Sequence, residues 1–141
     1  MKFLLLFLVS VAFASDLLEI DVLDDLLHND WDEERLDRLD DDKYRPRSQI
    51  LADVEALVQQ QPAYIQQAYR SSLQAAQARK TQRQQSRLQW LRNNGASQNV
   101  ISVQEQMNAI DNDMSLSERQ ADSQRYALYN SLSFEDRRRY F

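Results

Sequence analysis

Turn-forming residues are nearly missing from this chain, and their scarcity constrains the fold more than any other feature. The 141 residues include one Gly, two Pro and no Cys. Gly and Pro punctuate tight hairpins, so a sheet-rich fold is disfavoured. The residues that dominate instead, among them Gln, Ala, Leu and Arg, lose little side-chain freedom in a helix. The sequence therefore predicts an all-α protein, and the missing Cys excludes disulfides.

The first residues predict secretion. Lys2 supplies a positive charge, residues 3–9 are apolar, and Ala12-Phe13-Ala14 has the form of a signal-peptide cleavage site. This apolar run is too short to span a bilayer, and acidic residues follow it directly. We expect a signal peptide over residues 1–14, a secreted, extracellular mature protein and no transmembrane segment.

The remaining chain divides by charge. Residues 16–42 contain thirteen Asp or Glu against two Arg, a net charge of −11. Residues 43–141 contain fourteen Lys or Arg against nine Asp or Glu, a net charge of +5. Leu, Ile and Val recur at helical spacing among the acids, which indicates amphipathic helices. We predict an acidic N-terminal arm over residues 15–45 and a helical domain over residues 46–141.

Apolar residues of the body recur every three or four positions, as on one face of a helix. This pattern predicts helices starting near Pro46, at Pro62 and near residue 100, and the helix from Pro62 is expected to reach Asn93 and stop before Gly95. We expect an irregular bundle of four to five helices, preceded by the acidic arm. The polar stretch 77–87 is expected to protrude into solvent or to mediate self-association. The predicted core is formed by Ile50, Leu51, Val54, Leu57, Val58, Ile65, Leu73, Val100, Val103, Met107, Ile110, Leu116, Leu128 and Leu132.

Residues 102–137 contain a recognisable order of short motifs. They are Met107-Asn108-Ala109-Ile110, then Asn112-Asp113-Met114-Ser115-Leu116-Ser117-Glu118, then Leu128 and residues 132–137. In this order they resemble the second half of the SXP/RAL-type family of secreted roundworm antigens. The resemblance implies an all-helical secreted protein with a capacity to bind divalent cations.

One loop between two predicted helices has the spacing of a cation site. Asp111, Asp113 and Ser115 read D-x-D-x-S, as in the first ligand positions of an EF-hand, and Asp122 falls at the twelfth position. This spacing predicts a site for Mg²⁺ or Ca²⁺. The alternative is a helix stop followed by a capping box with Ser115 as the N-cap, because no Gly stands where an EF-hand turns sharply.

Arg79, Arg83 and Arg87 share one face of the long predicted helix at i, i+4 and i+8. They are candidates for binding an anion or a partner. The same residues could instead form a solvated face or a docking site for the acidic arm, and the opposite net charges of −11 and +5 favour the docking hypothesis. We expect no nucleic-acid binding, because the protein is predicted to be secreted and carries a net charge of −5.

Catalysis finds little support in the sequence. His28 is the only histidine, no Cys is present, and no serine lies in a Gly-x-Ser-x-Gly elbow. We therefore predict a secreted binding protein without enzymatic activity, with an unknown protein partner or with itself as partner. One alternative is a precursor in which an acidic pro-segment over residues 15–47 masks a basic mature protein. Another is an extracellular carrier of an apolar ligand.

Overall fold

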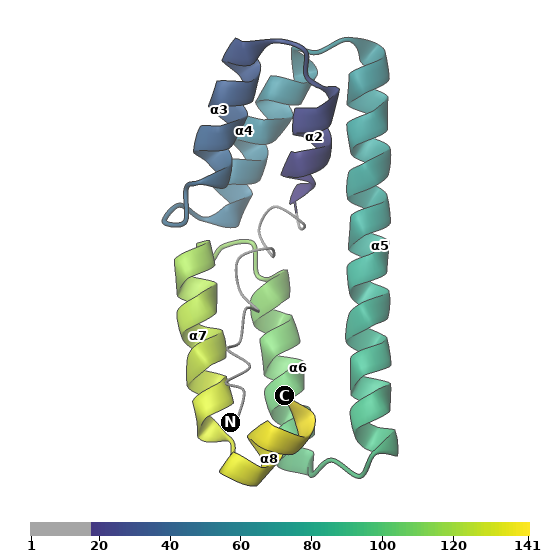
Figure 1. The fold of residues 1–141 in the computed structure, drawn as a ribbon, viewed down its shortest axis with the longest axis vertical. Coiled ribbons are helices and arrows are strands. Elements are labelled where there is room, and N and C mark those ends of the chain that lie inside the picture. Colours follow the sequence, from purple (N-terminus) through teal and green to yellow (C-terminus); the bar gives the residue numbers. More distant parts are fainter. Residues whose placement is uncertain (1–17) are drawn as a thin grey trace, which may run out of the picture.

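The computed structural model describes residues 18–141 and shows an all-α fold (Figure 1). The expected signal peptide lies outside the described residues. No strand occurs within residues 18–141, where Pro46 and Ser117 form an isolated bridge. The helices are α2 (Ile20–Leu26), α3 (Asp30–Asp40), α4 (Arg47–Gln59), α5 (Ala63–Asn93), α6 (Gln98–Asn112), α7 (Glu118–Ser131) and α8 (Phe134–Tyr140).

Helix α5 runs along one whole side of the molecule and carries the other helices in two groups (Figure 1). Helices α2, α3 and α4 pack beside its first half, and α6, α7 and α8 beside its second half. Pro62 is its N-cap, and its end is followed by Gly95 at φ 72°, a backbone conformation that Gly adopts without strain. The predicted extent of this helix is confirmed. Within residues 18–141, no helix combines the length and the apolar character needed to cross a membrane.

Two apolar cores correspond to these two groups. The first joins α2, α3, α4 and the start of α5, and the second joins the end of α5 with α6 and the C-terminal helices. Buried side chains of the first core are Leu18, Ile20, Leu23, Leu27, Leu36, Ile50, Val54, Leu57, Val58, Ile65 and Tyr69. Those of the second core are Leu91, Val100, Ile101, Val103, Leu132 and Tyr140.

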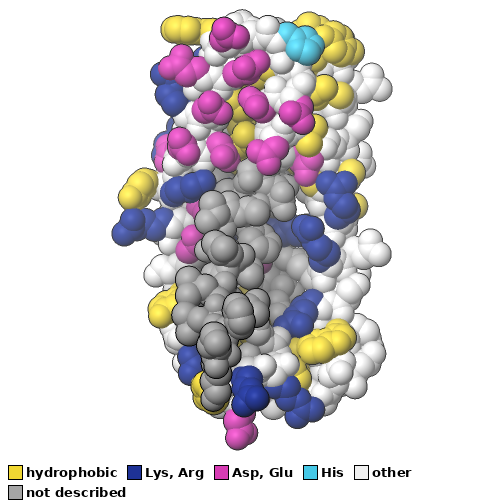
Figure 2. All heavy atoms as spheres, viewed as in Figure 1, with side chains coloured by type: hydrophobic (Ala, Val, Ile, Leu, Met, Phe, Trp, Pro, Cys, Tyr) yellow, Lys and Arg dark blue, Asp and Glu magenta, His cyan; other side chains and the backbone are white. Residues whose placement is uncertain are grey.

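The acidic segment is part of the bundle, which corrects the expected arrangement. Residues 18–141 form seven helices: the bundle includes, besides α4 to α8 of residues 46–141, the acidic helices α2 and α3, which pack into the first core with α4 and α5. The Tyr69 hydroxyl donates to the Leu18 carbonyl oxygen at 2.8 Å, inside this core. The carboxylates gather on the outer surface of this half (Figure 2). The acids therefore form the solvent face of two amphipathic helices whose other face is buried.

The predicted core is confirmed in part. Ile50, Val54, Leu57, Val58, Ile65, Val100, Val103 and Leu132 are buried. Leu51, Leu73, Met107, Ile110, Leu116 and Leu128 are only half-buried. The prediction missed two fully buried residues of α5, Tyr69 and Leu91. One face of the polar stretch 77–87 lies against α6, to which Lys80, Gln84 and Arg87 hydrogen-bond, and self-association through its exposed face stays a prediction.

Candidate functional site

The start of α4 is attached to the connection between α6 and α7. The backbone N–H of Arg47 donates to the Leu116 carbonyl at 3.0 Å, and that of Ser48 donates to the Met114 carbonyl at 2.8 Å. These bonds pair backbone groups that a helix N-terminus leaves unsatisfied. They also direct the Arg47 side chain toward the end of α6.

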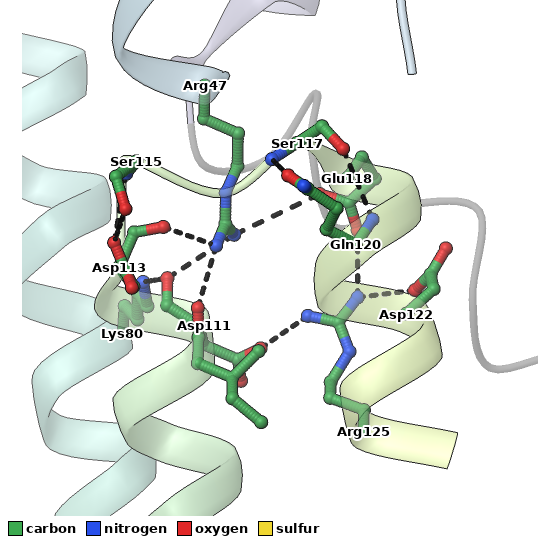
Figure 3. A network of polar contacts seen from close by, with 11 residues as sticks. Arg47, Lys80, Asp111, Asp113, Ser115, Ser117, Glu118, Gln120, Asp122 and Arg125 are labelled. Carbon is green, nitrogen blue, oxygen red and sulfur yellow. Dashed lines mark hydrogen bonds and ion pairs between the residues drawn. The ribbon is translucent and has the colours of Figure 1, made fainter. Parts of the chain in front are cut away.

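Arg47 is the central residue of a buried polar network, and it is 3% exposed (Figure 3). Its guanidinium donates to the carbonyl oxygens of Ile110 at 2.7 Å, Asp113 at 2.8 Å and Asp111 at 3.4 Å. The Glu118 carboxylate lies 3.9 Å away. Carbonyls at a helix C-terminus carry the negative end of the helix dipole, so a cation is stabilised there.

Arg125 on α7 neutralises three carboxylates beside this network (Figure 3). It pairs with Asp111, with Glu118 at 2.8 Å and with Asp122. Burial alone would lower the pKa of the Arg125 guanidinium, but hydrogen bonds to Asp122, Asp111 and Glu118 outweigh burial and raise it. Arg125 therefore stays charged and holds α7 against the end of α6.

The predicted cation ligands do not converge on one point. Asp111 and Asp122 face Arg125, while Asp113 accepts hydrogen bonds from the hydroxyl and backbone N–H of Ser115 at 2.6 and 2.9 Å. These bonds from Ser115 lower the pKa of Asp113. Within residues 18–141, no three acidic, His or Cys side chains are placed to share a metal ion. Because Arg125 and Ser115 already engage these carboxylates at separate places, divalent-cation binding stays a prediction that this geometry does not favour.

The capping box of α7 differs from the predicted one. Ser117, and not Ser115, is the N-cap, and its hydroxyl accepts from the Gln120 N–H at 3.2 Å. The Gln120 side chain in turn accepts from the Ser117 N–H at 2.9 Å. The shift has a physical reason: Asp113 holds Ser115 in a turn, and α4 pairs with the connection, so the helix starts later.

A cavity of about 230 Å³ lies beside this network, between α5 and α6. Its lining contains five basic side chains and one carboxylate, together with amides. The lining residues are Arg47, Ala76, Lys80, Arg83, Gln84, Arg87, Gln104, Asn108, Asp111 and Arg125. The cavity therefore favours a negatively charged occupant.

Three of these cations come from one face of α5, and no carboxylate hydrogen-bonds to any of them. Lys80 donates to the Asp111 backbone carbonyl at 2.6 Å. Arg87 donates to the Tyr140 carbonyl and, at 3.4 Å, to the Gln104 side chain. Arg83 makes no hydrogen bond or ion pair within residues 18–141. Burial lowers the pKa of Lys80 and of Arg87, and for Lys80 the attraction of Asp111 offsets only part of that effect.

The predicted basic face is therefore assembled in part. Arg83 and Arg87 line the cavity, but Arg79 turns away and pairs with Glu19 at 3.3 Å. Lys80 lines the cavity in its place. The prediction did not put Lys80 on the same helix face as Arg83 and Arg87, although 80, 83 and 87 fit the i, i+3, i+7 spacing of one face. Among the described ion pairs, Arg79–Glu19 is the one that joins the acidic segment to the stretch 77–87.

Lys80 also makes stability depend on pH. Burial lowers its folded-state pKa below the usual 10.5, so between the lowered pKa and 10.5 the unfolded chain binds more protons. The free energy of unfolding should therefore rise with pH across that window, while the burial penalty of the ammonium is fully present below it. Lys80→Met should lack this rise. Urea unfolding of both proteins from about pH 8 upward measures the difference, and an equal rise in both would contradict it.

Comparison with known proteins adds no relative from which a function could be transferred. The resemblance of residues 102–137 to the SXP/RAL-type family thus stays a prediction. No protein-family model, no curated protein and no solved structure matches this chain.

Proposed function

We propose that this chain is a secreted helical binding protein that holds an anionic ligand in the cavity between α5 and α6, without catalysis. One observation carries the proposal: Lys80, Arg83 and Arg87 line a single cavity, and no carboxylate hydrogen-bonds to them. An anion would supply the missing negative charge and would remove part of the cost of burying Lys80 and Arg87. The lining contains no Ser, Thr, Cys or His, its Lys80 donates to the Asp111 carbonyl, and the Asp111 carboxylate pairs with Arg125.

The precursor alternative finds less support. Cleavage before Ser48 would require access to Arg47, which is buried and whose backbone N–H is hydrogen-bonded. Removal of residues 15–47 would also take α2 and α3 out of the first core. Such a cleavage would expose apolar surface, and it would not simply unmask a basic domain.

The apolar-carrier alternative also finds less support. Ala76 is the only apolar residue among those that line the cavity. An apolar ligand there would separate charged groups from water and from each other, which is unfavourable. The cavity thus fits a charged ligand better than a lipid chain.

Thermal unfolding tests the proposal. At ten times its dissociation constant, an anion that binds only the folded state stabilises it by about 1.4 kcal/mol. For a chain of this size we expect a rise in melting temperature of about 5 °C. The wild type would be melted in phosphate, sulfate, malonate and citrate, with sodium chloride of equal ionic strength as reference. Arg83→Gln should lose the anion-specific part of the rise.

A matched control separates binding from general salt effects, because sulfate and phosphate stabilise many proteins by exclusion from their surfaces. Arg70 also lies on α5 and is exposed, and it does not line the cavity. Arg70→Gln should therefore behave as the wild type. Identical shifts in the wild type, Arg70→Gln and Arg83→Gln for every anion would refute the proposed function.

A further inference from the structure

The anion in this cavity has a definite chemistry. We propose that it is one tetrahedral oxyanion, a phosphate or sulfate, either free or as the end group of a small molecule, and not an extended polyanion. This inference rests on the proposed function, because it concerns the same cavity. Its support comes from the size of the cavity, the layout of charge on α5 and the donors that remain free.

The size favours a small group. The cavity measures about 230 Å³, below the roughly 300–1,000 Å³ of pockets that enclose drug-sized ligands. It is also walled by side chains from α4, α5, α6 and α7. One oxyanion with a short substituent suits such a space, whereas a polymer would leave most of its length outside.

The charge on α5 is concentrated at the cavity and does not form a row. Arg79 pairs with Glu19, and Arg92 pairs with Glu105 at 3.2 Å. Arg87 folds toward the C-terminus, its guanidinium carbon 4.9 Å from the Trp90 ring centre and 5.4 Å from that of Phe141. A polyanion is bound by many basic contacts along its length. Here Arg79 and Arg92 are paired with carboxylates, so Lys80, Arg83 and Arg87 are the basic residues around the cavity on α5 without a carboxylate partner, and the exposed Arg70 lies away from the cavity.

The amides of α6 are oriented so that donors remain. Gln104 accepts at Oε1 from Arg87 Nε at 3.4 Å and donates through Nε2 to Asn108 Oδ1 at 3.0 Å. These two hydrogen bonds occupy the acceptor oxygens of both amides. Within residues 18–141 they leave the Nδ2 hydrogens of Asn108 available as donors. Asn108 therefore presents a donor to the same cavity as the Lys80 ammonium and the Arg83 guanidinium.

Donors from two helices suit an acceptor that can be approached from several directions. A tetrahedral oxyanion offers oxygens all round its central atom, while a single carboxylate offers two oxygens in one plane. Asp111, the one carboxylate in the lining, is paired with Arg125 and attracts Lys80 as well, so it offsets only part of the positive charge around the cavity. Phosphate or sulfate matches this set of donors better than a carboxylate does.

Isothermal titration calorimetry on protein purified from a secreting host tests the inference. The probes are inorganic phosphate, glycerol 3-phosphate, inorganic sulfate, malonate and a heparin oligosaccharide, each in 0.15 M chloride. We expect one-to-one binding of phosphate or sulfate at least about tenfold tighter than malonate, a gap of about 1.4 kcal/mol. Arg83→Gln and Asn108→Ala should each weaken that binding about tenfold, because each removes a charge-assisted hydrogen bond. Arg70→Gln should leave it unchanged.

The outcomes separate this inference from the proposed function. Tighter glycerol 3-phosphate than inorganic phosphate identifies an end group of a small molecule, and equal binding identifies the free ion; both support the inference. Malonate that equals or exceeds phosphate and sulfate would overturn it and leave anion binding standing. Heparin binding without phosphate or sulfate binding would overturn it in favour of a polyanion surface. Phosphate binding that survives both Arg83→Gln and Asn108→Ala would place the ion elsewhere and would overturn it as well.

Discussion

Arg47→Ala should destabilise the fold by about 3–5 kcal/mol, the usual cost of removing one partner from a buried ion pair. The substitution would leave Glu118, whose side chain is 8% exposed, with Arg125 as its remaining cation among the described ion pairs. The carbonyls of Ile110 and Asp113 would lose the guanidinium that donates to them. Urea unfolding should show a lower midpoint at an unchanged slope.

A second arginine two residues away serves as the control. Arg45 pairs with Asp42 and Asp53, each at 2.8 Å, but its side chain is 39% exposed. Exposed ion pairs contribute about 0–1 kcal/mol, so Arg45→Ala should cost less than about 1 kcal/mol. Arg47→Lys should recover only part of the loss, because one ammonium cannot reproduce the planar fork that reaches three carbonyls. If Arg47→Ala lowered the free energy of unfolding by no more than Arg45→Ala does, the buried network would contribute no more to stability than an exposed ion pair.

Leu23→Ala should cost about 3–5 kcal/mol, as for other fully buried leucines replaced by alanine. Leu23 lies on the acidic helix α2 and is 0% exposed in the first core. The substitution removes apolar contact and leaves a cavity between α2 and its neighbours. Chemical unfolding followed by circular dichroism measures the loss.

Leu26 on the same helix provides the matched control. Its side chain is only half-buried, although it packs against the same core. Leu26→Ala should therefore cost clearly less, on the order of 1–2 kcal/mol, because less area is removed from water. A cost below about 1 kcal/mol for Leu23→Ala would mean that the acidic segment does not contribute to the folded core.

The helices with strong local signals could be predicted from the sequence. Pro62 and Gly95 mark the two ends of α5, because Pro fits the start of a helix and Gly fits the left-handed residue after its end. Helix α6 follows a regular spacing of Val, Met and Ile. Such signals lie within a few residues of the element that they define, so no knowledge of the tertiary structure is needed.

The place of the acidic segment could not be predicted in the same way. Its charge suggested an arm, while its leucines indicated helices without identifying the partner that would bury them. That partner comes from helices α4 and α5, whose buried residues reach Tyr69, 51 positions beyond Leu18. Local periodicity indicates which face of a helix is buried, but it does not identify the helices that cover that face.

The candidate site was predicted in part for a related reason. Spacings of i+3 and i+4 both place residues on one helix face, so Arg79 and Lys80 were equally compatible with Arg83 and Arg87. Only the packing of α6 and the ion pair with Glu19 distinguish them. The sequence likewise identifies the oxygen-bearing side chains of the loop Asp111–Ser115. It does not indicate that the distant Arg47 donates to the carbonyls of this loop.

The division of the apolar interior into two cores along one helix has a consequence for how this sequence can change. Substitutions in the first core and in the second lie far apart along α5, and effects of distant sites on stability add independently. A destabilising substitution in one core can thus be compensated by a second substitution in the same core, without any substitution in the other. Residues that belong to both halves, the middle of α5 and Arg47 at the start of α4, have no such freedom. In diverging copies of this chain, variation should run in two separate blocks and be lowest at the junction between them.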